Sequence, residues 1–324
     1  MYCAKLINKG KIMRIISCIA ILVIVNICMA ENQTINNAKE IESNINQENE
    51  NLKNQANDND PQTQFKLGTM YFKGIEVDRD EEKAFEWFEK AANQGYAQAQ
   101  FRLGTMYEYG WGVKKDHEKA FEWFEKAANQ GDVRAQSKLG TMYEYGWGVQ
   151  KDRKKAIEWY EKAINQGDVR AQSSLGTLYA EERDTEKAIY WLEKAANQGY
   201  TSSQFFLGMA YFSGQFWQQD TEKAIYWLEK AANQGNKWAQ YQLGYQYYVG
   251  RKFKQDTEKA IYWLQQSANQ VYPYAELELG VIYLEGKGIE KDLQKATEWL
   301  EKAKKDINPE VSKKATKILE DMKK

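Results

Sequence analysis

Cysteine is nearly absent from this 324-residue chain, since its three cysteines, Cys3, Cys18 and Cys28, all lie close to the N-terminus. The long remainder therefore has no disulfide framework and no cysteine ligands for a metal. Histidine is also scarce, because His117 is the single one in the chain. A usual zinc site needs several histidine or cysteine ligands. We therefore predict no metal centre, and nothing in the sequence predicts a cofactor.

An excess of charge of either sign is also missing. The chain has 45 lysines and arginines against 46 aspartates and glutamates, which gives a formal net charge of −1. A nucleic-acid-binding domain usually carries a clear basic excess. We therefore expect no nucleic acid among the partners of this protein.

Catalytic motifs are absent as well. The sequence contains no Gly-x-Ser-x-Gly elbow, phosphate-binding loop or dinucleotide fingerprint. No serine is followed by lysine three positions later, and no Lys-Thr-Gly occurs, so the usual serine route of β-lactam hydrolysis has no support. His117 alone is best interpreted as a surface residue. We predict that the protein is not an enzyme and has no catalytic residues.

Only one long apolar run occurs, and it lies at Ile15–Cys28. Four basic residues precede it, and in Cys28-Met29-Ala30 the first and third residues are small, which is the pattern of a secretory signal peptide over residues 1–30. We expect cleavage after Ala30 and export to the periplasm, the cell envelope or the medium. The alternative is an uncleaved membrane anchor, although the run is shorter than the roughly 20 residues that a membrane span needs.

What the chain has in abundance is repetition. Leu-Gly-x-x-Tyr occurs seven times and is followed each time by Lys-Ala-x-x-Trp. Such a fixed period indicates a solenoid of stacked units. The seven tryptophans, separated by 36 residues except for one interval of 32, are Trp87, Trp123, Trp159, Trp191, Trp227, Trp263 and Trp299.

Each repeat predicts two helices. In the second repeat Ala99, Leu103 and Tyr107 are four apart and share one face of the first helix. Gly104 lies on the same side, where its missing side chain would permit close approach of a neighbour. In the second helix Ala120, Trp123, Phe124 and Ala127 have the i, i+3, i+4, i+7 spacing of a buried stripe. Asp116 is expected as the N-cap, and Gly131 after the last turn. The tryptophan ring, Trp159 for example, is expected to fill the space between helix pairs.

These motifs resemble the Sel-like repeat (SLR) family, which is related to the tetratricopeptide repeat (TPR). The resemblance implies an all-α fold, a right-handed α/α superhelical solenoid of seven helix-turn-helix repeats with terminal capping helices. It also implies that the protein binds other proteins. In many exported relatives a pair of cysteines cross-links each repeat, and this chain departs from that pattern. Some secreted relatives are described as β-lactam hydrolases, which leaves an envelope hydrolase as an alternative.

The predicted organisation follows from the repeat period. Residues 31–61 form an Asn/Gln-rich linker, with a possible capping helix at Lys39–Ala56. Asn308 and Pro309 predict the start of a C-terminal capping helix within residues 304–324. The repeats between them occupy residues 62–303, divided as 62–95, 96–131, 132–167, 168–199, 200–235, 236–271 and 272–303. In the fourth repeat, four residues are missing from the loop, which predicts a tighter joint between its helices.

The candidate binding surface comes from positions that differ between repeats. In arrays of this kind the first helices line the concave face, and arginine and aromatic residues anchor interfaces. The predicted groove is basic at one end and aromatic at the other, although Tyr241 could equally pack between helices. A second set of rings in the loops, such as Trp111, Trp147 and Trp217, is better interpreted as local packing. The groove residues are Arg102, Arg134, Lys138, Arg170, Phe206, Trp238, Tyr241, Tyr245 and Tyr274.

The sequence therefore predicts an exported, non-catalytic scaffold that binds a protein or extended peptide in its groove. The alternatives are the envelope hydrolase and a membrane-tethered assembly platform. The partner's identity and the final compartment are not encoded in any recognisable motif.

Overall fold

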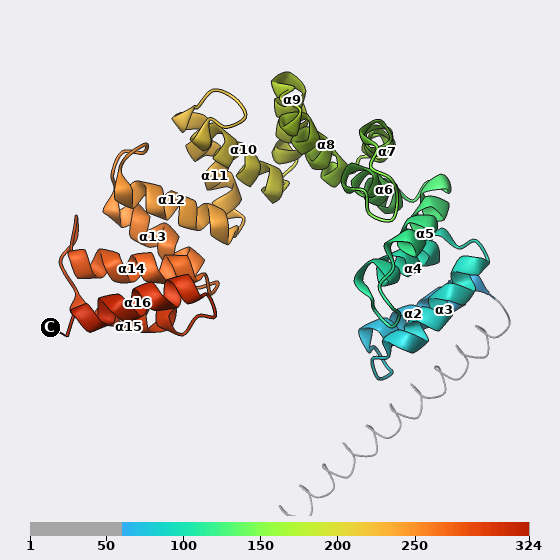
Figure 1. Cartoon of the computed structure of the whole chain (residues 1–324), viewed down its shortest axis with the longest axis horizontal. Coiled ribbons are helices and arrows are strands. Elements are labelled where there is room, and N and C mark those ends of the chain that lie inside the picture. The colour runs from blue at the N-terminus through green and yellow to red at the C-terminus, as the bar shows by residue number, and fades with distance from the viewer. Residues whose placement is uncertain (1–59, 324) are drawn as a thin grey trace, which may run out of the picture. The chain divides into compact units, whose positions relative to one another are not determined.

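The structure, a computed structural model, describes residues 60–323, and these form helices joined by short loops without any β-strand (Figure 1). The predicted signal peptide at 1–30 and the predicted capping helix at 39–56 lie outside the described residues. The described part divides into two compact units at Asp132 and Val133. The all-α solenoid expected from the repeats is confirmed, because consecutive helices pack together in pairs in both units.

The described residues of unit 1, 60–132, form two helix pairs. These are α2 (Pro61–Lys73) with α3 (Glu81–Asn93), and α4 (Ala97–Tyr109) with α5 (His117–Asn129). Unit 2 contains five pairs and one further helix. The pairs are α6 (Val133–Tyr145) with α7 (Arg153–Asn165), α8 (Val169–Glu181) with α9 (Thr185–Asn197), α10 (Thr201–Ser213) with α11 (Thr221–Asn233), α12 (Lys237–Val249) with α13 (Thr257–Ala268), and α14 (Pro273–Glu285) with α15 (Leu293–Lys304). The last helix, α16 (Pro309–Asp321), packs on α15.

The conserved spacing inside each repeat produces the core. Ala99 and Leu103 are fully buried in α4, and Tyr107 is 7% exposed. The glycine between them is required by close packing, because a Cβ atom at Gly104 would lie 2.8 Å from the ring of Phe124. The predicted contact face is therefore confirmed, and the neighbour that approaches the glycine is the partner helix of the same repeat.

Aspartates begin the second helices. Asp116 accepts a 3.0 Å hydrogen bond from the backbone N–H of Lys119, which is the expected N-cap contact. Gly131 has a φ of 90°, in agreement with its predicted place after the last turn. In the fourth repeat residues 182–184 join α8 to α9, whereas residues 110–116 join α4 to α5. The shortened joint places Arg183 at a φ of 60°.

Trp159, whose ring was expected to fill the space between helix pairs, is only partly buried, and so are most of the repeat tryptophans. Trp159 is half-buried, and the ammonium of Lys162 lies 3.6 Å from the centre of its ring. The next residue, Tyr160, is fully buried and fills the space beneath Gly140. The physical reason is that the tryptophan lies at the edge of the apolar stripe, where a lysine one turn later covers its exposed face. Trp227 and Trp263 are the buried exceptions.

A ladder of glutamine side chains supplements the apolar core. In unit 1, the side-chain N–H of Gln130 donates a 2.7 Å hydrogen bond to the carbonyl oxygen of the Gln100 side chain. Gln100 in turn donates to the backbone carbonyl of Ala92 in the preceding repeat, at 3.1 Å. Buried polar groups are costly unless they are paired, so this ladder satisfies them and ties neighbouring repeats. Equivalent glutamine pairs in unit 2 are Gln136–Gln166, Gln172–Gln198, Gln204–Gln234 and Gln240–Gln270.

Candidate partner-binding surface

Within unit 2, some of the first helices of neighbouring repeats approach one another. Contacts join α6 to α8, α12 to α14, and α14 to α16, whereas the second helices of the same unit contact one another less. Helices that crowd together in a stack lie on its inner side. Side chains on the first helices that point away from the buried Ala-Leu-Tyr face therefore form the candidate surface of unit 2.

The basic residues of the predicted surface are distributed over both units. Arg102 lies on α4 of unit 1 and is half-buried. Arg134 and Lys138, on α6 of unit 2, are also half-buried. Arg170 on α8 is exposed, and its guanidinium lies 3.4 Å from the carboxylate of Asp168. Of these four side chains, Arg170 is the most accessible to a partner.

The aromatic residues of α12 and α14 form one cluster. Tyr241 stacks on Tyr245 with their ring centres 5.9 Å apart, and its ring centre is 6.1 Å from that of Tyr274. Tyr272, which the sequence analysis did not include, lies 5.2 Å from Tyr241 between the same helices. We call these four residues the tyrosine cluster. All four are half-buried, so each ring remains partly accessible to solvent.

Trp238 is the most exposed aromatic residue beside this cluster, with 52% of its surface accessible. It lies on the first turn of α12, and the ammonium of Lys237 is 5.7 Å from its ring centre and 5.9 Å from that of Tyr272. The lysine therefore links the tryptophan to the tyrosine cluster. An indole that is half exposed retains about half of its surface for contact with another molecule.

Phe206 has different neighbours from the other predicted aromatics. Its ring contacts are with Phe216, at 5.4 Å, and Trp217, at 6.4 Å, in the loop that follows α10. Trp217 is 8% exposed, so this part of the loop set is local packing, as the sequence favoured. Trp217 also borders a hollow of about 420 Å³ that Ile189 and Tyr211 help to line.

The other loop rings are more accessible. In unit 1, Tyr109 stacks on Trp111 with ring centres 4.8 Å apart, and Trp111 packs on Phe72 of the preceding repeat at 5.3 Å. Tyr145 and Trp147 repeat the stacked arrangement in unit 2 at 5.2 Å. Each pair covers a helix end, while the tyrosine remains 53% exposed. Trp111 therefore serves packing between repeats of unit 1, and both tyrosines leave an exposed surface.

Carboxylates accompany the tyrosine cluster on α14. Burial raises the pKa of Glu278 to about 7, and the nearby Glu285 adds to this shift, while Lys314 opposes it. The hydroxyl of Tyr248 donates a hydrogen bond to the carboxylate of Glu285. The aromatic end of the surface is therefore also acidic, which the residue pattern did not predict. One feature of the sequence does indicate the acidic character. The sixth position of α14 is Glu278, whereas the same position in the first three repeats is basic, at Lys66, Arg102 and Lys138.

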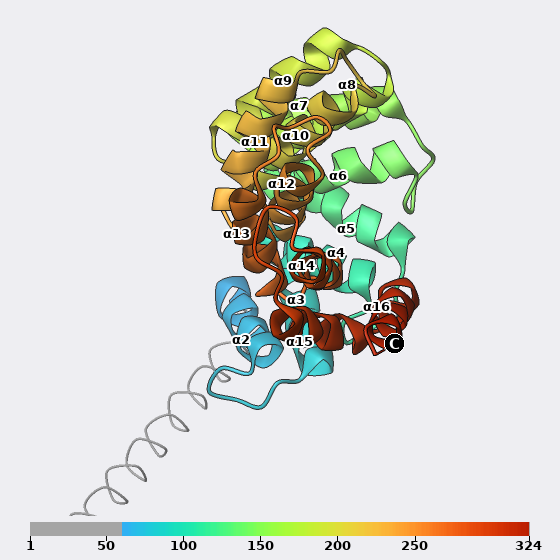
Figure 2. The same cartoon turned by 90° about the vertical axis from the view of Figure 1, so that its left-hand side faces the viewer.

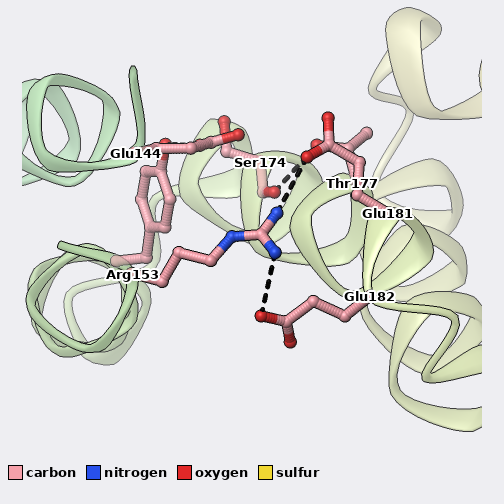
Figure 3. A network of polar contacts seen from close by, with 7 residues as sticks. Glu144, Arg153, Ser174, Thr177, Glu181 and Glu182 are labelled. Atoms are coloured by element: carbon pink, nitrogen blue, oxygen red, sulfur yellow. Dashed lines mark hydrogen bonds and ion pairs between the residues drawn. The ribbon is translucent and has the colours of Figure 1, made fainter. Parts of the chain in front are cut away.

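A second polar network surrounds the shortened joint of the fourth repeat (Figure 3). Arg153 extends from α7, and its guanidinium lies 2.9 Å from the carboxylate of Glu181 and 3.2 Å from that of Glu182. Beside it, the hydroxyl of Tyr160 donates a 2.6 Å hydrogen bond to the buried Glu144, whose pKa is raised by burial. The two ion pairs of Arg153 hold α7 against the end of α8.

Residues 60–323 offer neither a metal site nor a membrane-spanning helix. No cluster of three or more histidine, cysteine, aspartate or glutamate side chains has a geometry that would hold a metal ion. None of the helices in this range is both long and apolar enough to cross a membrane. His117, the single histidine, is half-buried at the start of α5.

The stacked helix pairs and the recurring Ala-Leu-Gly-Tyr face define an all-α solenoid of the TPR-like class. The sequence matches the Sel1 repeat, and the chain belongs to this family. The seven matched segments are 61–96, 97–132, 133–168, 169–200, 201–236, 239–272 and 273–306.

Solved structures of similar proteins agree with this assignment. One is a protective antigen present in uropathogenic Escherichia coli strains, which displays an SLR fold; it is 36% identical with a TM-score of 0.68. The alignment covers 79% of this chain and 56% of the antigen, so this chain spans little more than half of the antigen's length. Another is a Sel1 repeat protein from Oxalobacter formigenes, which is 31% identical over 86% of this chain and 81% of that one, with a TM-score of 0.67.

Yeast Tom70 shares the fold alone, with 15% identity and a TM-score of 0.53 over 87% of this chain and 59% of that one. A comparison with curated proteins found no match.

Proposed function

We propose that this protein is an exported, non-catalytic scaffold that binds a protein or an extended peptide on the first helices of unit 2. The observation that supports this most is Trp238, which is 52% exposed beside the tyrosine cluster. Aromatic residues that are accessible before binding are the usual anchors of protein interfaces. The family adds support, because Sel1 repeat proteins are typically interaction scaffolds rather than enzymes.

The basic residues would assist the same partner in a different way. Arg170 is exposed and interacts weakly with Asp168 at 3.4 Å. An exposed charge mainly steers association and contributes less to the final affinity. Substitution of Arg170 by alanine is therefore expected to slow association, most clearly at low salt, if the partner is acidic at this point.

Export rests on the N-terminal pattern of Lys5, Lys9, Lys11 and Arg14 followed by the apolar run to Cys28. Cell fractionation and intact-mass measurement test it. A mature protein that begins at Glu31 in the exported fraction agrees with the proposal. A membrane-bound chain that retains residues 1–30 would favour the tethered platform instead.

Binding is tested by affinity capture with two matched triple variants. The surface variant carries Trp238→Ala, Tyr245→Ala and Tyr274→Ala. The control carries Tyr190→Ala, Tyr226→Ala and Tyr262→Ala, which remove tyrosines that are 57%, 48% and 53% exposed on second helices. A partner that the wild-type protein and the control capture, and the folded surface variant does not, agrees with the proposal. Equal capture by both variants would contradict it.

A further inference from the structure

Glu278 is a half-buried carboxylate on the last complete helix pair of unit 2. Its helix, α14, contacts α12, and both helices can be followed in Figures 1 and 2. The charge of Glu278 raises the pKa of Tyr241 and Tyr248 on α12. Within residues 60–323, its carboxylate has no hydrogen-bond or ion-pair partner. A charged group in such a place is costly unless an opposite charge or hydrogen-bond donors compensate it. At Glu278 only solvent and weak charge interactions provide this compensation, because its oxygens are not among the fully buried side-chain atoms of the described residues.

The charged neighbours of Glu278 do not supply that compensation. Glu285 lies two turns further along α14 and has the same sign. Lys314 on α16 attracts Glu278 from a distance, but its ammonium is already 2.8 Å from the carboxylate of Glu310. The tyrosines on α12 contribute ring faces, and the hydroxyl of Tyr248 donates its hydrogen bond to Glu285 rather than to Glu278. The net charge of the groups around Glu278 is therefore negative.

The chemistry of this arrangement selects one kind of occupant. Ring faces of tyrosine carry negative potential and attract cations, and a carboxylate beside them adds a full negative charge. An anionic group would be repelled by Glu278 and Glu285 together. An apolar group would leave the carboxylate unpaired and further desolvated.

We propose that Glu278, together with Tyr241 and Tyr245, receives the positively charged end of a lysine or arginine side chain of the protein partner. This inference rests on the proposed binding function and specifies the chemistry of the partner. The apolar part of such a side chain would lie along the tyrosine rings, since the stems of lysine and arginine pack well on apolar surface. Trp238 would hold the partner segment next to it.

The high pKa of Glu278 makes the contact sensitive to pH. The free carboxyl has a pKa of about 7, raised from 4.5 by burial and by Glu285. A bound cation favours the charged form, so binding below pH 7 requires the release of one proton. The affinity is therefore expected to fall about tenfold for each pH unit below the pKa of about 7 and to level off above it. The groups that face Glu278 and share this effect are Glu285, Tyr241, Tyr248 and Lys314.

The test uses two synthetic pentapeptides as probes and the full chain as the protein. One probe is acetyl-Gly-Ala-Lys-Ala-Gly-amide, and the other has norleucine in place of lysine, which keeps the stem and removes the charge. Binding is followed by nuclear magnetic resonance of tyrosine rings labelled with ¹³C, with the signals assigned through Tyr241→Phe and Tyr245→Phe. The lysine peptide is expected to shift the Tyr241 and Tyr245 signals at pH 8, and the norleucine peptide to leave them nearly unchanged.

The matched variants are Glu278→Gln and, as the control, Glu258→Gln, which removes an exposed carboxylate of α13. We expect Glu278→Gln to weaken binding of the lysine peptide about tenfold and to abolish its pH dependence, and Glu258→Gln to change neither. Equal shifts from both peptides, an unaffected Glu278→Gln variant, or no shift at millimolar peptide would overturn the inference. Capture of the partner through Trp238 would still stand in that case, because the binding function is tested separately.

Discussion

The hydroxyl of Tyr160 donates a 2.6 Å hydrogen bond to the carboxylate of Glu144, and both residues are buried. The equivalent position carries phenylalanine in the first two repeats, at Phe88 and Phe124, and leucine in the fourth, at Leu192. The third repeat has therefore replaced a purely apolar contact by a polar one that holds a buried acid.

Removing this hydroxyl should destabilise unit 2. The variant Tyr160→Phe keeps the ring but removes one of the two tyrosine hydroxyls that hydrogen-bond to the buried Glu144, the other being that of Tyr145. We expect a loss of about 0.5–1.5 kcal/mol in the free energy of unfolding, the net value of a typical hydrogen bond. Urea denaturation at neutral pH measures it. The double variant Tyr160→Phe with Glu144→Leu removes both partners and should recover most of the loss. A double variant that is no more stable than the single one would show that the hydrogen bond is not the cause.

The buried ring and the repeat tryptophan should differ strongly in their contributions. Tyr160 is fully buried, so Tyr160→Ala is expected to cost about 3–5 kcal/mol. Trp159 is half-buried beneath Lys162, so Trp159→Ala should cost less, about 1–2 kcal/mol. Thermal melts of the two variants decide the order. A larger loss for Trp159→Ala would restore the original expectation that the tryptophan fills the core.

These two positions show what the sequence could and could not predict. The repeat period, the Ala-Leu-Tyr face and the Asp116 cap follow from local spacing, because each is satisfied within one helix or one repeat. The burial of Tyr160 rather than Trp159 depends on how far the apolar stripe rotates against the neighbouring helix. The spacing alone cannot tell which of two adjacent residues at the edge of an apolar stripe is the more buried.

The candidate surface was predictable to a similar degree. Trp238, Tyr241, Tyr245 and Tyr274 were selected because they differ between repeats, and the structure brings the three tyrosines together. Tyr272 was not selected because it precedes its helix, where helical spacing gives no information. The unpaired state of Glu278 is a property of three separate helices, α12, α14 and α16, and no local pattern could reveal it.

The glycine of the first helix should not tolerate a side chain. A Cβ atom at Gly140 would lie 2.5 Å from the ring of Tyr160. Alanine favours helix by about 1 kcal/mol over glycine, but overpacking of a filled core typically costs about 1–3 kcal/mol. We expect Gly140→Ala to be destabilising in urea denaturation. Its effect should shrink when Tyr160→Ala is also present, because the clash is then removed, and fully additive losses would contradict this explanation.

Glu278 should also make stability depend on pH. Its pKa rises from 4.5 to about 7 on folding, so between these values the folded state retains a proton that the unfolded state has lost. The free energy of unfolding should therefore fall by about 1–3 kcal/mol as the pH rises through this range. Urea denaturation of the wild type and Glu278→Gln at pH 5 and pH 8 tests this. Relative to the wild type, the free energy of unfolding of Glu278→Gln should be higher at pH 8 than at pH 5. A difference between the two proteins that is the same at both pH values would contradict a raised pKa of Glu278.

The central claim is that exposed aromatic residues on the first helices of unit 2 bind a partner, and Trp238→Ala tests it most directly. The measurement pairs the dissociation constant for the captured partner with the melting temperature of the same variant, and Tyr226→Ala on α11 is the control. We predict that Trp238→Ala weakens binding by about thirtyfold, or 2 kcal/mol, as expected for an aromatic anchor, while its melting temperature stays at the wild-type value. An unchanged dissociation constant, or a loss of binding that accompanies a large fall in melting temperature, would contradict the account.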